Sequence, residues 1–346
     1  MREAWWRPDR LAARRGKLAA RGRILAALRE FFAEEGYVEV QTPALQVSPG
    51  LEPHLKAFAT TLHDPQNGST RRFYLHTSPE FAMKKLLAGG LPRIWQLAHV
   101  FRDGERSATH HPEFAMLEWY RADASYRDLM DECEALLRRA QAAAGVPALH
   151  WQGRSADVNS AWTRITVAEA FARYVGIDLL ATIPDPRRPD AALLGVAASG
   201  IGIAPHPGDD WEALFFRIFL ERIEAQLGIG APTILYDYPV AMAALSRRKP
   251  DDPRLAERFE LYVCGLELAN AFSELTDPAE QRVRFAADQA RKQVLYGEIY
   301  PADEDFLAAL EQGLPECAGI ALGFDRLVML ATDAERIEEV LWAPVV

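Results

Sequence analysis

The chain has 346 residues, a formal net charge of −10 and 49% hydrophobic residues. This length supports one large domain or two small ones, and the acidic balance argues against a protein that grips a nucleic-acid backbone over a wide surface. We expect neither a membrane span nor a secretory signal, because no apolar run is long enough. Cys133, Cys264 and Cys317 lack paired spacing, which argues against disulfides or a zinc site and favours the cytoplasm.

The N-terminal segment predicts an amphipathic helix over residues 16–35, ending at Gly36, followed by a strand and Pro43. This segment is also basic. Its charges could touch an acidic partner or form the solvated face of the helix, and the second interpretation is favoured because charge runs on helices are usually solvated. The basic residues are Arg7, Arg10, Arg14, Arg15, Lys17, Arg21 and Arg23.

Two predicted strands over residues 57–77 flank a polar turn, and Ser78 and Pro79 then open a helix that stops at Gly89. A strand is predicted over residues 93–102.

Alternating residues after Arg102 form the most informative pattern. Period-two alternation predicts a strand that places Phe114, Glu118 and Tyr120 on one face. An ordinary hairpin with an exposed charged turn is the alternative. A strand with two polar groups and an aromatic ring on the same side as an arginine is typical of a binding site.

The remaining chain predicts a long helix over 123–144, a helix from Trp211 to Leu227, strands over 233–240 and 257–275, and a charged helix over 278–295. Residues 146–232 are less regular, and we expect an insertion or subdomain packed on a single domain that spans 1–346. Strands and helices do not alternate regularly, and several strand pairs resemble hairpins. The predicted fold class is therefore α+β, with an antiparallel sheet flanked by helices.

Three segments, in order, resemble motifs 1, 2 and 3 of the class II aminoacyl-tRNA synthetases: Gly36–Leu45, Phe101–Tyr120 and Gly319–Leu330. Thr77–Glu80 and Glu260–Leu275 resemble the lysyl-tRNA synthetases specifically. The resemblance extends from about residue 20 to the end of the chain. It implies the class II catalytic core and a homodimer formed through motif 1.

The resemblance also implies ATP as a substrate. A class II enzyme positions a carboxylate and ATP and stabilises charge on the phosphoryl oxygens, for which the planar, permanently charged guanidinium group is suited. By resemblance, Arg102 and Arg326 carry the catalytic charges, and Phe114 lies on the face of the adenine opposite Arg326. Gly104 stands where the family usually has a glutamate, and we expect Glu105 to substitute. The implied ATP-binding residues are Arg102, Asp103, Gly104, Glu105, His110, His111, Phe114, Glu267, Leu268, Gly323 and Arg326.

Glu260 and Glu267 match the family's metal carboxylates, which implies Mg²⁺ bridging the ATP phosphates. Their spacing of seven residues does not place both on one strand face, so we expect the chain to bend near Gly265. The alternative is a carboxylate pair beside arginines that binds no metal.

A pocket for a lysine-like substrate should be acidic, since that substrate carries two ammonium groups. By resemblance, Glu80 binds the amino group near the carboxylate, while Glu274 and Tyr120 bind the distant one. A ligand without the ammonium would leave a carboxylate unpaired. The implied substrate-binding residues are Ser78, Glu80, Glu118, Tyr120, Ala269, Asn270 and Glu274.

Motif 1 begins near residue 36, which leaves no room before it for an anticodon-binding barrel. In this the chain resembles a family of lysyl-tRNA synthetase paralogues that attach (R)-β-lysine to a lysine of elongation factor P. That resemblance implies elongation factor P and β-lysine as partners, without anticodon-type tRNA recognition. Ala269 stands where lysyl enzymes have glycine, and we expect its methyl group to favour β-lysine. The alternatives are an adenylating enzyme for another amine or tRNA, and a non-catalytic regulatory subunit.

Overall fold

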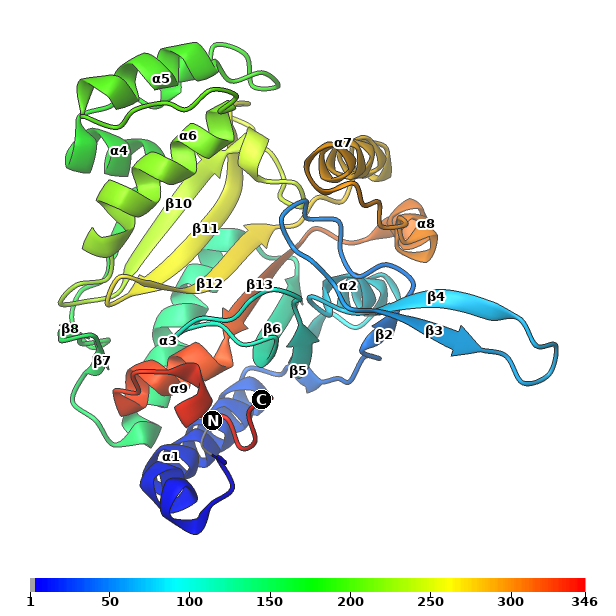
Figure 1. Cartoon of the computed structure of the whole chain (residues 1–346), viewed down its shortest axis with the longest axis vertical. Coiled ribbons are helices and arrows are strands. Elements are labelled where there is room, and N and C mark those ends of the chain that lie inside the picture. The colour runs from blue at the N-terminus through cyan, green and yellow to red at the C-terminus, as the bar shows by residue number, and fades with distance from the viewer. Residues whose placement is uncertain (1–3, 346) are drawn as a thin grey trace.

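A computed structural model describes residues 4–345. Its centre is an eight-stranded sheet in the order β1-β5-β6-β13-β12-β11-β10-β9 (Figure 1). The neighbours are antiparallel except for the two outermost pairs, β1 with β5 and β10 with β9, which are parallel. The predicted antiparallel α+β fold is therefore confirmed, with parallel pairs at its two edges. The strands are β1 (Val38–Glu39), β5 (Arg93–Phe101), β6 (Glu113–Ala122), β9 (Thr163–Thr166), β10 (Thr233–Pro239), β11 (Leu255–Val263), β12 (Leu266–Ser273) and β13 (Cys317–Gly323).

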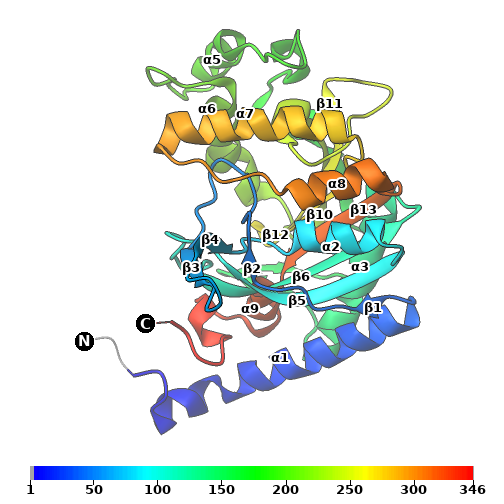
Figure 2. The same ribbon diagram turned by 90° about the vertical axis from the view of Figure 1, so that its right-hand side faces the viewer.

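Helices cover both faces of this sheet. The helices α1 (Pro8–Glu34), α3 (Tyr126–Ala144) and α9 (Phe324–Thr332) share one buried apolar cluster with the sheet. On the other side, α2 (Glu80–Ala88), α7 (Pro278–Tyr296) and α8 (Glu304–Gly313) share a second. Figure 2 shows α7 and α8 on the side of the sheet opposite α1. The sheet is thus the middle layer of the domain, with one layer of helices on each face.

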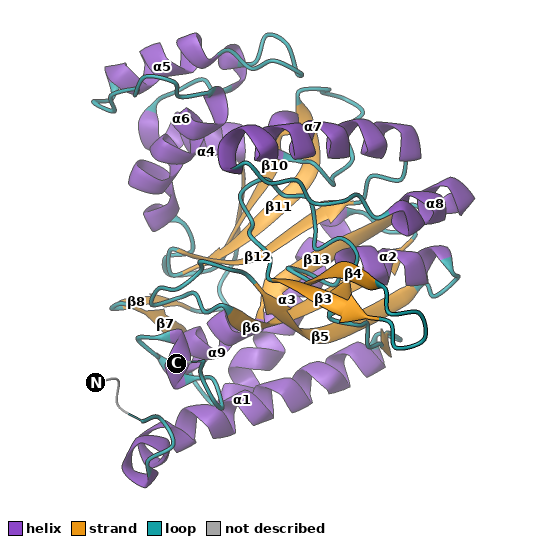
Figure 3. Cartoon of the chain, turned by 45° about the vertical axis from the view of Figure 1, so that its right-hand side comes forward, coloured by secondary structure: helices purple, strands orange, loops and turns teal. Residues whose placement is uncertain are grey.

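The less regular region 146–232 contributes β9 to the sheet and packs its helices against β10 and β11 (Figure 3). The expected helix from Trp211 to Leu227 is shorter than predicted: α6 ends at Ile218, and residues 219–223 continue as a π-helical turn. The other elements of this region are β7 (Leu149–Trp151), β8 (Arg154–Ala156), α4 (Val167–Val175), α5 (Ala191–Gly200) and α6 (Trp211–Ile218).

A small three-stranded sheet stands beside the main one. It consists of β2 (Leu45–Gln46), β4 (Thr70–Leu75) and β3 (Ala59–His63), and its β3–β4 hairpin projects from the body in Figure 1. The two strands predicted around the polar turn are confirmed. The loop that joins β2 to β3 supplies residues to the site described below.

The first helix departs from the prediction in two ways. It begins at Pro8 rather than near residue 16. Its basic face is also not simply solvated, because Arg14 donates to the carbonyls of Glu338 and Leu341, and the Arg21 guanidinium pairs with Asp325. These charges fasten the C-terminal segment to α1. No helix in the range 4–345 is long and apolar enough to cross a membrane.

Candidate active site

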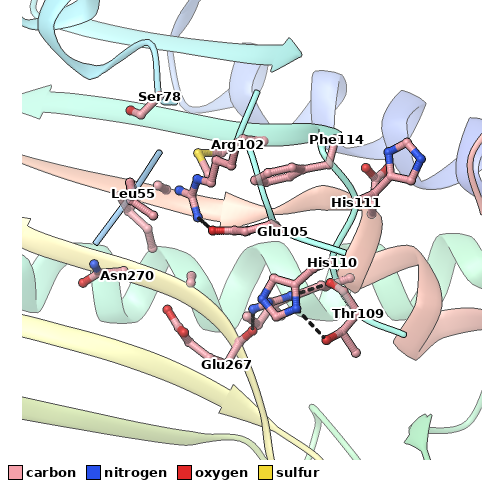
Figure 4. A pocket seen from close by; sticks show the side chains of 18 of the residues that line it. Leu55, Ser78, Arg102, Glu105, Thr109, His110, His111, Phe114, Glu267 and Asn270 are labelled. Carbon is pink, nitrogen blue, oxygen red and sulfur yellow. Dashed lines mark hydrogen bonds and ion pairs between the residues drawn. The ribbon is translucent and has the colours of Figure 1, made fainter. Parts of the chain in front are cut away.

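A cavity of about 290 Å³ opens on the face of the main sheet, between β6, β12, β13 and the loops before α2 and β6. Figure 4 shows side chains from these segments converging on it. Most of the predicted site residues line this cavity, although they come from positions up to 248 residues apart in the chain. The predicted residues that line it are Ser78, Glu80, Arg102, Glu105, His110, His111, Phe114, Tyr120, Glu267, Leu268, Ala269, Asn270, Gly323 and Arg326.

The alternation predicted in β6 explains how one strand serves both core and site. Ala115, Leu117 and Trp119 are buried in the cluster that α1 and α3 share with the sheet. The side chains of Phe114 and Tyr120 lie on the opposite face and border the cavity, as successive side chains of a strand must. The period-two prediction is therefore confirmed.

Arg326 is held in one position by several acceptors. Its Nη1 donates to the carbonyl of Glu267 at 2.7 Å, its Nη2 lies 2.7 Å from His110 Nε2, and its Nε donates to the carbonyl of Thr109 at 3.3 Å. The guanidinium therefore keeps its charge at a defined place, and no carboxylate within residues 4–345 is directly paired with it.

His110 supports this arrangement as a neutral side chain. Burial and then the Arg326 charge lower the pKa of His110, so the ring has a lone pair available for the Arg326 donor near neutral pH. Its other nitrogen, Nδ1, lies 2.8 Å from Ser107 Oγ. His110 thus orients Arg326 without competing for its charge.

Asp325, next to Arg326, fixes the start of α9. Its carboxylate accepts from the backbone of Ala115 at 2.7 Å and pairs with Arg21. This buried residue therefore ties α9 to β6 and α1, and so sets where Arg326 emerges.

Arg102 lies across the cavity from Arg326. Its guanidinium carbon is 5.3 Å from the centre of the Phe114 ring, and its Nη1 is 3.8 Å from Glu105. Gly104 adopts a left-handed backbone with φ of +85° and does not border the cavity, whereas Glu105 does. The turn at Gly104 therefore presents the following carboxylate to the cavity.

Two other predicted nucleotide contacts are already engaged elsewhere. The Nδ1 of His111 lies 2.6 Å from the Glu113 carbonyl, and its Nε2 accepts from the backbone of Val345 at 3.1 Å. Asp103 pairs with Lys56 at 3.1 Å and does not line the cavity. In this structure both residues fasten neighbouring segments.

A buried lysine, Lys84, lies beneath the opposite end of the cavity. Its ammonium pairs with Glu80, one helical turn earlier, and with Glu274 at 2.5 Å. Burial alone would lower the pKa of Lys84, but the carboxylates of Glu274 and Glu80 raise it above its ordinary value. The lysine therefore stays charged and pairs with two carboxylates that the sequence assigned to the substrate, while Glu274 Oε1 is buried without a hydrogen-bond partner among the described residues.

Glu118 forms a second buried polar group there. It accepts from Ser78 Oγ at 2.7 Å and from the Tyr120 hydroxyl at 2.9 Å. Burial raises the pKa of Glu118 to about 8, although both donors act in the other direction. Glu118 and Glu274 do not border the cavity directly and lie behind Ser78 and Tyr120.

The predicted metal carboxylates lie on a hairpin. The chain turns at Cys264 and Gly265, with φ of +56° and +77°, so that Glu260 on β11 and Glu267 on β12 come near each other. The expected bend at Gly265 is confirmed. Tyr238 and Tyr262 donate to Glu260 Oε2, and Arg258 Nη2 donates to Oε1 at 2.5 Å.

Glu267 differs from Glu260 in its surroundings. No hydrogen bond joins its carboxylate to another residue described in the structure, and burial and then Glu260 raise its pKa to about 7. Three histidine, cysteine or acidic side chains do not come together as a metal site within residues 4–345. Glu267 is therefore the carboxylate available to a cation that also has phosphate ligands.

Sequence reasoning missed several residues of the site. Lys84 follows Glu80 by four positions, a spacing that predicts an ion pair on a helix but not its burial. The cavity-lining residues not predicted are Glu52, Leu55, Thr109, Met116, Phe272, Ile320, Ala321, Asp325 and Ile337.

Comparison with known proteins agrees with this geometry. The family described as tRNA synthetases class II (D, K and N) matches residues 5–346. The chain is 41% identical over 328 residues to the elongation factor P–(R)-β-lysine ligase of Vibrio cholerae, which covers 95% of each chain. It is 38% identical over 340 residues to the protein of the same name from Proteus mirabilis, covering 98% of this chain and 97% of the relative.

The lysine–tRNA ligase of Pelotomaculum thermopropionicum is 37% identical over 325 residues, which are 94% of this chain but 62% of that relative. Three relatives that match this chain over nearly their whole length are named elongation factor P–(R)-β-lysine ligase. The chain therefore belongs to the class II tRNA synthetase family (D, K and N).

Proposed function

We propose that this chain activates (R)-β-lysine with ATP and transfers the β-lysyl group to a lysine ε-amine of elongation factor P. The observation that carries the proposal is one cavity with two guanidinium groups and, beside and beneath them, a cluster of acidic side chains. Relatives that match nearly the full length bear the corresponding name. An acidic pocket suits a diamino acid, and the arginines suit its carboxylate and a nucleotide.

The reaction has two steps. First, a carboxylate oxygen of β-lysine attacks the α-phosphorus of ATP, and pyrophosphate leaves. Then the neutral ε-amine of the acceptor lysine attacks the carbonyl carbon of the adenylate, AMP leaves with the carboxyl oxygen, and the amine loses a proton. Neither step needs a covalent nucleophile from the protein.

The residues act by positioning and charge. We assign Arg102 to the substrate carboxylate and α-phosphate, and Arg326 to the adenine and γ-phosphate side. Because His110 and two backbone carbonyls hold Arg326 in place, its donors need little reorganisation when charge develops. We assign Glu105 to the adenine amino group.

Mg²⁺ fits the nucleotide end of the cavity through Glu267, which lines the cavity and whose carboxylate has no hydrogen-bond partner in the described part of the chain. Glu260 would have to release donors from Tyr238, Tyr262 or Arg258 to bind it directly. When bound, Mg²⁺ would neutralise charge on the phosphates of ATP.

Ala269 is our candidate for the preference between isomers. It lies on β12, is 2% exposed and borders the cavity next to Asn270. The change Ala269→Gly should shift adenylation toward α-lysine, since removal of a packed methyl group alters fit by about 1–3 kcal/mol. Pyrophosphate exchange with each isomer measures the ratio, and an unchanged ratio contradicts this role.

The decisive experiment is intact-mass analysis of elongation factor P after incubation with the enzyme, ATP and (R)-β-lysine. We expect a mass increase of one lysyl residue that requires all three components and is strongly reduced by Arg102→Met. A parallel reaction with tRNA tests the alternative suggested by the lysine–tRNA ligase relative. Charging of tRNA without modification of elongation factor P would refute the proposal.

We also infer a cytoplasmic homodimer. The three cysteines are buried and unpaired, which suits a reducing compartment. The edge strand β1 belongs to motif 1 and leaves Val38 50% exposed. Sedimentation equilibrium should give the dimer mass, and Val38→Asp should shift it toward the monomer.

A further inference from the structure

We infer that Glu52, in the loop between β2 and β3, binds the amino group of the substrate that lies near its carboxylate. The inference rests on the proposed function and extends it to a residue that the motifs did not single out. Glu52 borders the main cavity together with Ser78, Glu80 and Arg102.

The first argument is that the other acidic groups near this amine already have partners. Glu80 pairs with the ammonium of Lys84, and Glu118 accepts from Ser78 and Tyr120. No other residue described in the structure donates to the carboxylate of Glu52, and its Oε2 is buried without a partner.

Charge balance gives the second argument. Glu80, Glu274 and Lys84 together carry one net negative charge when all are ionised, and burial raises the pKa of Glu118 to about 8, so that this carboxyl is mostly protonated at neutral pH. A diamino acid brings two ammonium groups. Glu52 supplies the second negative charge. Burial and then the neighbouring Glu80 raise the pKa of Glu52, and an ammonium group placed beside it would favour its ionised form.

The third argument is position. The charges that act on Glu52 include Glu80 and Arg102, and Arg102 is the residue assigned to the substrate carboxylate. Glu274 and Tyr120, assigned to the distant ammonium, meet against Gly319 on β13. Glu52 therefore lies toward the carboxylate end of the substrate, where the position of the amino group distinguishes β-lysine from α-lysine.

The loop that carries Glu52 is firmly held. Lys292 of α7, which is 2% exposed, donates to the carbonyls of Pro53 at 3.0 Å and Leu55 at 2.5 Å. The Tyr300 hydroxyl accepts from the backbone of Ala57 at 2.9 Å. A carboxylate on an anchored loop loses little freedom on binding, which favours a specific contact.

The test separates the contribution of this amino group from the rest of the site. Pyrophosphate exchange gives the KM for (R)-β-lysine, and inhibition of that exchange gives the KI of 6-aminohexanoate, which keeps the carboxylate and distant amine but lacks the 3-amino group. We expect Glu52→Gln to raise the KM for β-lysine about tenfold to a hundredfold. The same variant should change the KI of 6-aminohexanoate and the KM for ATP less than twofold, because neither ligand has the amino group that Glu52 binds.

Glu298→Gln is the matched control, since Glu298 does not line the cavity and acts on Lys292 and Tyr300, which hold the loop. This variant should leave the KM for β-lysine and the KI of 6-aminohexanoate unchanged. If Glu52→Gln weakens both ligands equally, Glu52 has only a structural role and the inference is wrong. Should that variant be unstable, the ratio of KM to KI in Glu52→Ser answers the same question, because it does not depend on the amount of active enzyme. Absence of β-lysine-dependent exchange in the unchanged protein would instead refute the proposed function.

Discussion

Replacing Gly319 by alanine should weaken β-lysine binding while leaving ATP binding nearly unchanged. Gly319 lies on β13 directly opposite Tyr120 of β6. A Cβ atom at this position would approach both the Tyr120 ring and Glu274 Oε1 closer than 3.0 Å, a separation that real Cβ atoms essentially never show. Its backbone is not left-handed, so the whole effect comes from this steric overlap.

The magnitude follows from how little these neighbours can move. Tyr120 is 2% exposed and donates to Glu118, while Glu274 is 1% exposed and pairs with Lys84. Overpacking of such a site costs about 1–3 kcal/mol of folding free energy. Loss of one hydrogen bond to a charged group costs about 1.5–3 kcal/mol of binding, which raises KM for β-lysine roughly tenfold to a hundredfold.

Pyrophosphate exchange with varied β-lysine and varied ATP measures the two affinities separately, and urea denaturation measures the stability. The matched control is Gly22→Ala in α1, where a Cβ meets nothing within 4 Å and alanine should stabilise the helix by up to about 1 kcal/mol. A Gly319→Ala enzyme with an unchanged KM for β-lysine would refute the placement of the distant ammonium against Tyr120 and Glu274.

Three further outcomes are expected. Arg326→Lys should lower the rate of adenylate formation about a hundredfold in single-turnover assays, because an ammonium group cannot reproduce the several hydrogen bonds that hold the guanidinium in place. A loss below threefold would contradict the role of Arg326. The kcat/KM for β-lysine should rise between about pH 7 and 9 and level above that, since the Glu118 carboxyl, whose pKa burial raises to about 8, ionises over this range and then attracts ammonium groups. A profile unaltered by Glu118→Gln would argue against this. Lys84→Met should lower the free energy of unfolding in urea by about 3–5 kcal/mol, because it leaves buried carboxylates unpaired. Adding Glu274→Gln should restore part of this loss, and no recovery in the double variant would count against the ion pair.

Local patterns in the sequence determined much of the fold. The alternation in β6, the helix between Ser125 and Gly145, and the bend at Gly265 depend on neighbouring residues, through side-chain direction, capping and permitted backbone angles. The resemblance to the class II motifs, rather than any local pattern, predicted that Arg102, Phe114 and Arg326 share one site, and all three line the same cavity. The start of α1 and the end of α6 were predicted wrongly, because tertiary packing decides where a helix with weak end signals begins and stops.

Tertiary structure alone decided which charges meet. The sequence assigned Glu80 and Glu274 to the substrate, but the fold brings Lys84 between them, and it turns Arg14 and Arg21 of a seemingly solvated helix onto the C-terminal segment. Partners separated by many residues carry no local signal of their pairing. Burial sets the energy with which a charged side chain interacts with its neighbours, and it shifts the pKa of that side chain. It depends on everything packed around the side chain.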